Sequence, residues 1–257
     1  MKKKPTPQQL TVIDSRQISP NVQRLVLQGD DQTELPQECA GGYIKLMFTD
    51  RGDTDLGGLA EGQRPTLRTY TIRRVPPQPH SMEVDFVRHT TTATDWGFAA
   101  RWAMNAKLGD TISIAGIGSA SPINLEADWF FMVADLTSLP ALITQFERLP
   151  ANATGYAVIQ VPELADKQPL TVPENLQLIW ISGAESLATT VRALPWLAGR
   201  AAVWSACEFE QMRALRHYFR NDQAVARERI YISSYWKQGV SEDGHKRLKR
   251  QDAEAAN

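Results

Sequence analysis

The sequence predicts a chain of two domains, an N-terminal antiparallel β-barrel with one helix and a following α/β domain with a parallel sheet. Its 257 residues are enough for two domains of ordinary size. Up to about Ile123, strand-like segments are short and separated by Gly and Pro, which is typical of a sandwich or barrel. From Trp129 onward, strand and helix patterns alternate, which implies a parallel sheet covered by helices.

Short apolar or alternating runs mark the strands of the first half. Met82, Val84 and Phe86 alternate with acidic residues, which is the period of a half-buried strand. The other expected strands are Val22–Leu27, Tyr43–Phe48, Arg68–Arg73 and the segment around Ile112 and Ile114.

A single helix interrupts this rhythm at Asp95 to Lys107. Thr94 is placed to cap its first turn, and Gly109 lies just beyond its end. Its apolar residues recur at helical spacing. They are Trp96, Ala99, Ala100, Ala103 and Met104.

The second half predicts a βαβαβαβ order. We place the barrel domain at residues 1–124, the α/β domain at 125–236 and a polar tail at 237–257, the end of which is loose or a surface helix. The expected strands are Trp129–Ala134, Tyr156–Val161, Leu176–Ser182, Ala201–Ala206 and Arg229–Ser234. The expected helices are Ser138–Leu149, Glu185–Leu197 and Glu208–Phe219, the last with Phe209, Met212, Leu215 and Phe219 on one face.

Composition excludes several classes of protein. Lys plus Arg is 28 and Asp plus Glu is 29, so the protein as a whole has no basic field for a nucleic-acid partner, although a local basic pocket is still allowed. No apolar run is long enough to span a membrane. The two cysteines, Cys39 and Cys207, allow no disulfide scaffold, and the lysine-rich N-terminus is not a secretory signal. We therefore expect a cytoplasmic protein with reduced thiols.

Motifs for hydrolysis and metal binding are missing. The sequence has no serine-hydrolase, zinc-protease or P-loop motif, and its four histidines lie in unrelated contexts, so no metal site is expected. Gly116-Ile117-Gly118 looks like an incomplete dinucleotide motif, but Pro122 follows and no helix does. We interpret it as a barrel turn.

The stretch Arg68 to Arg73 carries the clearest chemical signal. Alternation places Arg68 and Tyr70 on one face of a strand, where a guanidinium and an aromatic ring can hold a phosphate and a flat ring together. Thr71 can reach a ring nitrogen. Further on, Thr90 to Thr94 enters the helix, and free N–H groups there suit a pyrophosphate. The alternatives are an ordinary exposed strand and a solvated helix cap.

An ordered set of motifs resembles the siderophore-interacting flavoproteins, which are relatives of ferredoxin–NADP reductases. Arg68-x-Tyr70-Thr71-x-Arg73 and Val84 to His89 match the first domain of that family. Ala134 to Ala141, Ala206-Cys207-Glu208 and Tyr235-Trp236-Lys237 match the second. The resemblance covers about Val12 to His245.

The resemblance implies a cytoplasmic reductase that passes electrons through FAD to a ferric siderophore. Its donor is NAD(P)H or reduced ferredoxin. Arg68 pairs with the flavin pyrophosphate, whereas Tyr70 and Thr71 lie against the isoalloxazine and near its N5 atom as the catalytic pair. The other residues implied to contact the cofactor are Asp85, Val87, His89, Thr91, Thr92, Ala93, Thr94 and Trp236.

The same resemblance places the substrate beside basic side chains. Lys45, Arg73 and Lys237 are candidates because many ferric siderophores are anions. The alternative for Lys45 is a simple exposed lysine, and the alternative for Trp236 is packing between domains.

Departures from the family pattern keep other functions open. Thr90 to Ala93 lacks the family's glycine, and Ile117 stands where an arginine is common. The turn Asp135 to Pro140 also lacks a glycine, which makes a close approach of a dinucleotide harder. The alternatives are a general flavin or ferredoxin–NADP reductase-like enzyme and a siderophore-binding protein without activity.

Overall fold

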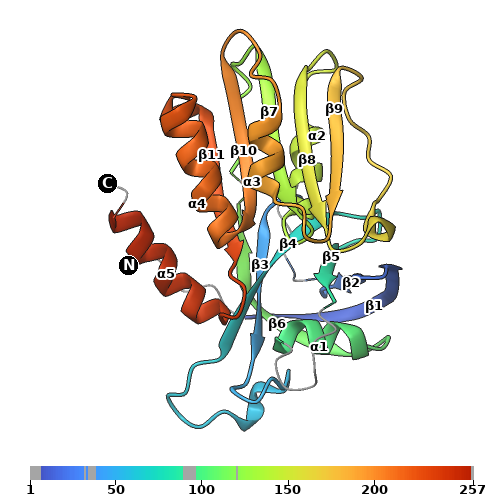
Figure 1. Ribbon diagram of the computed structural model, residues 1–257. Helices are drawn as coiled ribbons and strands as arrows, with labels where there is room; N and C mark the ends of the chain where they lie inside the picture. Colours follow the sequence, from blue (N-terminus) through green and yellow to red (C-terminus); the bar gives the residue numbers. More distant parts are fainter. Residues whose placement is uncertain (1–6, 32, 34–38, 89–96, 120, 256–257) are drawn as a thin grey trace. The chain divides into compact units, whose positions relative to one another are not determined.

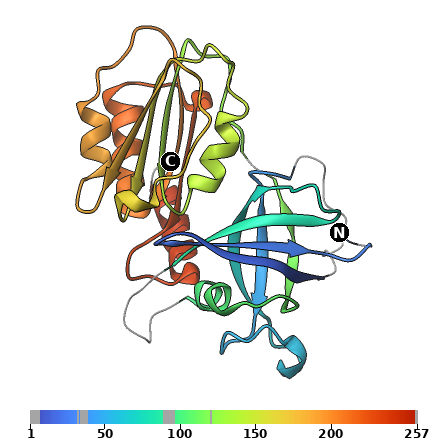
Figure 2. The same cartoon turned by 90° about the vertical axis from the view of Figure 1, so that its right-hand side faces the viewer.

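A computed structural model describes residues 7–31, 33, 39–88, 97–119 and 121–255. The chain divides into two compact units, Met1–Ala120 and Ser121–Asn257 (Figures 1 and 2). In these described ranges, no helix has both the length and the apolar character that a membrane crossing requires.

The first unit is the predicted antiparallel barrel. Its six strands close in the order β1-β2-β5-β4-β3-β6. The sequence did not single out β1, because its polar residues hide the apolar alternation of Leu10 and Val12. The strands are β1 (Gln8–Ser19), β2 (Val22–Gln28), β3 (Tyr43–Phe48), β4 (Thr66–Arg74), β5 (Ser81–Val87) and β6 (Thr111–Gly118).

Helix α1 (Phe98–Asn105) packs Ala99 and Ala103 into the barrel core. In the described residues it begins after Gly97, which is its N-cap; the expected cap Thr94 lies outside them. Gly116 and Gly118 correct the turn prediction, because both belong to β6 and Gly118 pairs with Tyr43.

The second unit contains the predicted parallel sheet, in the order β11-β10-β7-β8-β9. Each pair of neighbours is parallel, with helical connections between the strands. The strands are β7 (Trp129–Asp135), β8 (Gly155–Val161), β9 (Leu176–Ser182), β10 (Ala201–Glu208) and β11 (Ile230–Trp236).

The helices of the second unit are shorter than the sequence suggested. Helix α4 ends at His217 and continues as a wider π-helical turn, Tyr218–Asp222. Its expected apolar face is confirmed, since Phe209, Met212, Leu215 and Phe219 all lie in the core. The helices are α2 (Leu139–Phe146), α3 (Leu187–Ala193), α4 (Phe209–His217) and α5 (Glu242–Ala255).

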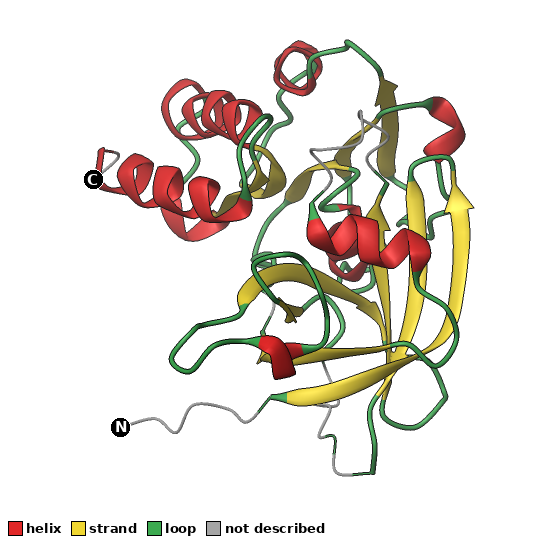
Figure 3. Cartoon of the chain, turned by 90° about the horizontal axis from the view of Figure 1, so that it is seen from below, coloured by secondary structure: helices red, strands yellow, loops and turns green. Residues whose placement is uncertain are grey.

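Helix α5 lies in the segment predicted as a loose tail or a surface helix. It runs beside α4, as Figures 1 and 3 show, and an ion pair between Arg216 and Asp252 joins the two helices. At its start, the ring of His245 is buried and its Nε2 atom lies 2.8 Å from Oγ of Ser234 in β11. These contacts fix α5 on the edge of the sheet.

Candidate functional site

Strand β4 positions the residues with the clearest chemical signal. Ile72 is fully buried in the barrel core, and Tyr70 packs partly against the same core. Arg68 follows on this inward face, as alternation predicts. Thr71 therefore points to the opposite face of the strand.

The side chains of Arg68 and Tyr70 are held by aromatic rings. The ring of Tyr70 lies 4.4 Å from that of Phe86, tilted by 36°. The guanidinium of Arg68 lies 5.5 Å from the ring centroid of Phe98 in α1, and its Nη1 donates to the carbonyl of Leu67 at 2.9 Å. Both side chains remain partly accessible, so a guanidinium and an aromatic ring stand on one face near α1.

Thr71 shares its face with Lys45 of β3. The strands pair antiparallel, with Thr71 opposite Tyr43 and Thr69 opposite Lys45, so these four side chains project from the same side of the ribbon. The ammonium of Lys45 lies 5.8 Å from the ring centroid of Tyr43. No carboxylate in the described ranges forms an ion pair with Lys45.

Tyr43 is a candidate that sequence reasoning missed. This residue is 36 % exposed, although it begins an apolar strand. The ring covers Gly118, where an added Cβ atom would come within 2.1 Å of the ring carbon Cζ. The available signal was Gly118, which pairs with Tyr43, but we interpreted Gly116 to Gly118 as a turn from the sequence.

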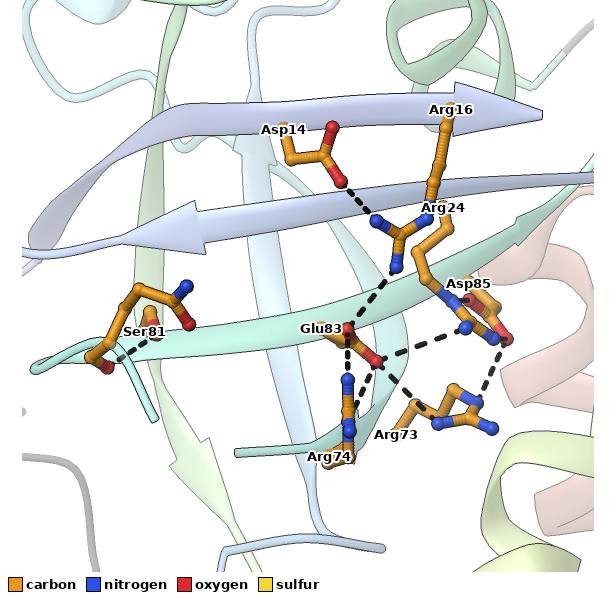
Figure 4. Close-up of polar contacts among 9 residues, drawn as sticks. Asp14, Arg16, Arg24, Arg73, Arg74, Ser81, Glu83 and Asp85 are labelled. Carbon is orange, nitrogen blue, oxygen red and sulfur yellow. Dashed lines mark hydrogen bonds and ion pairs between the residues drawn. The ribbon is translucent and has the colours of Figure 1, made fainter. Parts of the chain in front are cut away.

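The outer face of the barrel carries a cluster of arginines and carboxylates, shown in Figure 4. Arg24 binds Asp85 with two hydrogen bonds of 2.6 and 2.8 Å. Arg74 binds Glu83 in the same manner, at 2.8 and 3.1 Å. Arg73 lies 3.5 Å from Glu83 and 3.6 Å from Asp85. The predicted cofactor residue Asp85 and the predicted substrate residue Arg73 thus contact each other.

A bulge explains why two successive arginines reach one carboxylate. Ile72 pairs with Val84, but Arg74 pairs with Glu83, so β4 contains one extra residue at this point. Arg73 is that residue, and its side chain joins Arg74 on the outer face.

Charge balance in this cluster keeps Glu83 ionised. The side chain is 2 % exposed, and burial alone would raise its pKa. The hydrogen bond from Arg74 and the charges of Arg24, Arg74 and Arg73 outweigh burial and lower the pKa below its ordinary value. Burial and the nearby charge of Arg24 lower the pKa of Arg73, whose Nε is buried without a hydrogen-bond partner.

The remaining predicted cofactor residues of the barrel lie at or beyond the end of β5. Val87 is half-buried and pairs with Val22. His89, Thr91, Thr92, Ala93 and Thr94 lie outside the described residues. Arg88 was not predicted; its Nη1 donates to Gln23 at 3.1 Å, while its Nε is buried without a hydrogen-bond partner.

In the second unit, Trp236 is fixed by the turn that follows β7. Its indole N–H donates to Asp135 at 2.7 Å, and Thr137 donates to the same carboxylate through Oγ1 at 2.5 Å. Burial raises the pKa of Asp135, and the hydrogen bonds from Thr137 and Trp236 oppose that rise. The carboxylate of Asp135 thus accepts the hydrogen bonds of the glycine-free turn after β7, at the carboxyl edge of the sheet.

Lys237 differs from Lys45 in its surroundings. Its ammonium lies 2.5 Å from Oε1 of Glu210 and 4.8 Å from the ring centroid of Phe209. The hydrogen bond from Lys237 lowers the pKa of Glu210. The charge of Lys237 is therefore compensated within its own unit. Among the described residues, no group of His, Cys, Asp and Glu is placed to hold a metal ion.

Two family models match the chain in sequence order. A siderophore-interacting FAD-binding domain matches residues 11–120. A siderophore-interacting protein model matches residues 127–239. The first match covers the barrel and the second covers the parallel sheet.

Relatives match over nearly their whole length. Ferric vibriobactin reductase ViuB of Vibrio cholerae is 29 % identical over 93 % of this chain and 92 % of its own. The NADPH-dependent ferric-chelate reductase of Escherichia coli is 26 % identical over 89 % and 92 %. The crystal structure of the siderophore-interacting protein SipS from Aeromonas hydrophila superimposes with a TM-score of 0.82, at 30 % identity over 96 % and 98 % of the two chains.

Proposed function

Because the chain belongs to the siderophore-interacting protein family, we propose that it is an FAD-dependent reductase of ferric siderophores. The observation that carries this proposal is the match of both units, in order, to proteins named as ferric reductases. Electrons pass from NAD(P)H through FAD to iron held in the chelate. Siderophores bind Fe(III) far better than Fe(II), so reduction releases the metal.

The described residues of the barrel fit a flavin. Tyr70 offers a partly accessible ring beside the guanidinium of Arg68, which suits a flat ring system joined to a diphosphate. At the end of β5, the buried Nε of Arg88 is a donor without a partner. Buried N–H donors without an acceptor are rare in folded proteins. A phosphate or ribityl oxygen of the cofactor would accept a hydrogen bond from Nε of Arg88.

FAD supplies the conversion from a hydride donor to a one-electron acceptor. This chain would position that chemistry: Arg68 would bind the diphosphate, Tyr70 would pack against the isoalloxazine, and Thr71, from the other face of β4, would hydrogen-bond near N5. The proposed contacts with the rest of the cofactor come from Asp85, Val87, His89, Thr91, Thr92, Ala93, Thr94 and Trp236.

The substrate side is proposed to be basic. Lys45 shares the outward face of Thr71 and has no carboxylate partner in the described part of the chain, so its charge is available to an anionic chelate. Arg73 and Lys237 are the further substrate candidates, although carboxylates of their own units hold both.

NADPH is the donor that the name of the Escherichia coli relative supports. Reduced ferredoxin is a second donor, favoured by the glycine-free turn in which the carboxylate of Asp135 occupies the space near the backbone. The proposal places the enzyme in the cytoplasm, where either donor is present.

An anaerobic visible spectrum of the purified protein tests this function. We expect an oxidised-flavin spectrum that bleaches with NADPH, NADH or reduced ferredoxin and returns when a ferric siderophore is added. Bleaching without recovery would indicate a general flavin reductase. A colourless protein that takes up no added FAD would refute the proposal.

A further inference from the structure

A cavity of ≈ 250 Å³ lies inside the second unit, between α4, β11 and α5. Its volume is below the roughly 300 Å³ at which pockets for drug-sized ligands begin, so it suits a small ligand. Four basic side chains and one carboxylate line it. They are Arg216, Arg220, Arg227, Lys249 and Asp252.

The carboxylate of Asp252 is already engaged. Both of its oxygens accept hydrogen bonds from Arg216, at 2.5 and 2.7 Å. Nε of Arg213 approaches the same carboxylate at 3.3 Å. Asp252 therefore joins α5 to α4, and it does not neutralise the other three cations of the cavity.

These three cations have no acidic partner in the ranges that the structure describes. Lys249 donates to Oγ of Ser233 and to the carbonyl of Ser234, both at 2.9 Å and both uncharged. Nε of Arg220 is buried without a hydrogen-bond partner. Burial lowers the pKa of Lys249, and burial together with the charges of Arg216 and Arg227 lowers that of Arg220.

The cations come from separate elements and surround the space. Arg220 lies in the π-helical turn after α4, a feature often found at functional sites. Arg227 precedes β11, and Lys249 lies on α5. One arginine satisfies a planar carboxylate, as Arg216 does for Asp252. Several donors from different directions suit the tetrahedral oxygens of a phosphate.

Two of the three cations lie away from the donor site of the fold, although Ser233 and Ser234, in the carboxyl half of β11, also line the cavity. Nucleotides bind such sheets outside the carboxyl ends of the strands. Because α4 runs from the carboxyl end of β10 back toward the amino end of β11, Arg220 and Arg227 lie toward the opposite edge (Figure 1). We propose that this cavity binds a small ligand through a phosphoryl group held by Arg220, Arg227 and Lys249.

Calorimetric titration of the flavin-loaded protein at constant ionic strength tests the proposal, with pyrophosphate, adenosine 5′-monophosphate and citrate as probes. We expect saturable binding of the phosphoryl compounds and weaker binding of citrate. Tighter binding of pyrophosphate indicates a free inorganic ligand, and tighter binding of the nucleotide indicates a nucleotide phosphate; either result supports the site.

Matched variants decide whether binding occurs in the cavity. Arg220→Gln and Arg227→Gln should each weaken pyrophosphate binding by about tenfold, which is the effect of losing one charge-assisted hydrogen bond. Arg227 is exposed, so its replacement leaves the core intact. Arg250→Gln removes the same charge from an exposed position of α5 outside the cavity and should leave binding unchanged.

Three results would overturn the proposal: no saturable binding, equal losses in all three variants, or citrate binding more tightly than the phosphoryl compounds. Flavin absorbance and ferric-chelate reduction are recorded for each variant. They report on the barrel and the redox reaction, so the proposed function and the phosphoryl site can fail independently.

Discussion

The two arginine clusters of this chain are both rich in basic residues, but they differ in how far carboxylates offset the positive charge. On the barrel, all four oxygens of Glu83 and Asp85 contact guanidinium groups. In the second unit, the only carboxylate lining the described cavity is engaged by Arg216, and Arg220 keeps a buried donor without a partner. The first cluster joins strands together, whereas the second has charge available for a ligand.

The difference has a local cause in each case. Strand pairing places Arg24 directly opposite Asp85, and the bulge brings Arg73 and Arg74 to Glu83. In the second unit, the basic residues lie on consecutive helices and the segment between them, where no strand pairing supplies an acid. A high density of arginines therefore does not by itself identify a binding site; our proposal for the second unit depends on arginines that have no carboxylate partner among the described residues.

The largest expected effect comes from breaking the balanced cluster. Glu83→Gln leaves Arg16, Arg73 and Arg74 around a neutral amide in a site that is 2 % exposed. We expect a loss of about 3 kcal/mol in the free energy of unfolding, because cations near a buried position lose their counter-charge. Urea denaturation of the two proteins measures the difference.

Asp14→Asn is the matched control for that experiment. Asp14 also pairs with Arg16, at 2.6 Å, but the two side chains are 40 % and 50 % exposed. An exposed pair contributes about 0–1 kcal/mol, so this variant should unfold close to the wild type. Equal losses in the two variants would contradict the buried role of Glu83.

The pH dependence of stability also tests the role of Glu83 in the barrel cluster. The pKa of Glu83 is lower in the folded protein than in the unfolded chain, so its contribution is complete above the ordinary glutamate pKa of about 4.3. It is lost as pH falls from there through the lower folded value. Unfolding followed from pH 7 to 3 should therefore show a decline in stability that is shallower in Glu83→Gln.

Asp135 provides an internal contrast in that titration. Burial raises its pKa, so it affects stability in the opposite sense: its contribution decreases as pH rises through the folded value. It remains in both the wild type and the Glu83→Gln variant. The difference between their curves thus isolates Glu83, and identical pH profiles would show that the cluster does not control acid stability.

Periodicity in the sequence predicted most of the strands, the antiparallel barrel of the first unit and the parallel sheet of the second. It predicted less of the chemistry, because the decisive features depend on pairing between distant strands. The contact of Arg24 with Asp85 requires the register of β2 and β5, and the bulge at Arg73 adds one residue that no sequence pattern marks. Polar alternation hid β1 for a related reason, since its outward residues carry no core signal.

The cavity in the second unit was equally hidden from sequence reasoning. Its charged residues lie on the polar side of a helix predicted from its apolar face, in the segment after that helix and in the predicted polar tail. The π-helical turn at Tyr218–Asp222 departs from regular helical spacing, so the position of Arg220 could not be derived from it. Only the folded arrangement of α4, β11 and α5 gathers these cations.

The smallest expected effect extends the comparison to two lysines. Lys45 has no carboxylate partner in the described residues, whereas Lys237 is paired with Glu210. Lys45→Gln should raise KM for an anionic ferric siderophore by about fivefold, equivalent to about 1 kcal/mol for one partly exposed charge, without loss of flavin. Lys237→Gln should have a smaller effect, because Glu210 already offsets that charge.

Steady-state kinetics with increasing salt separates the two variants, since only the Lys45 effect should fade as salt screens the attraction. If both variants behave alike, local charge balance does not determine which lysine attracts the chelate.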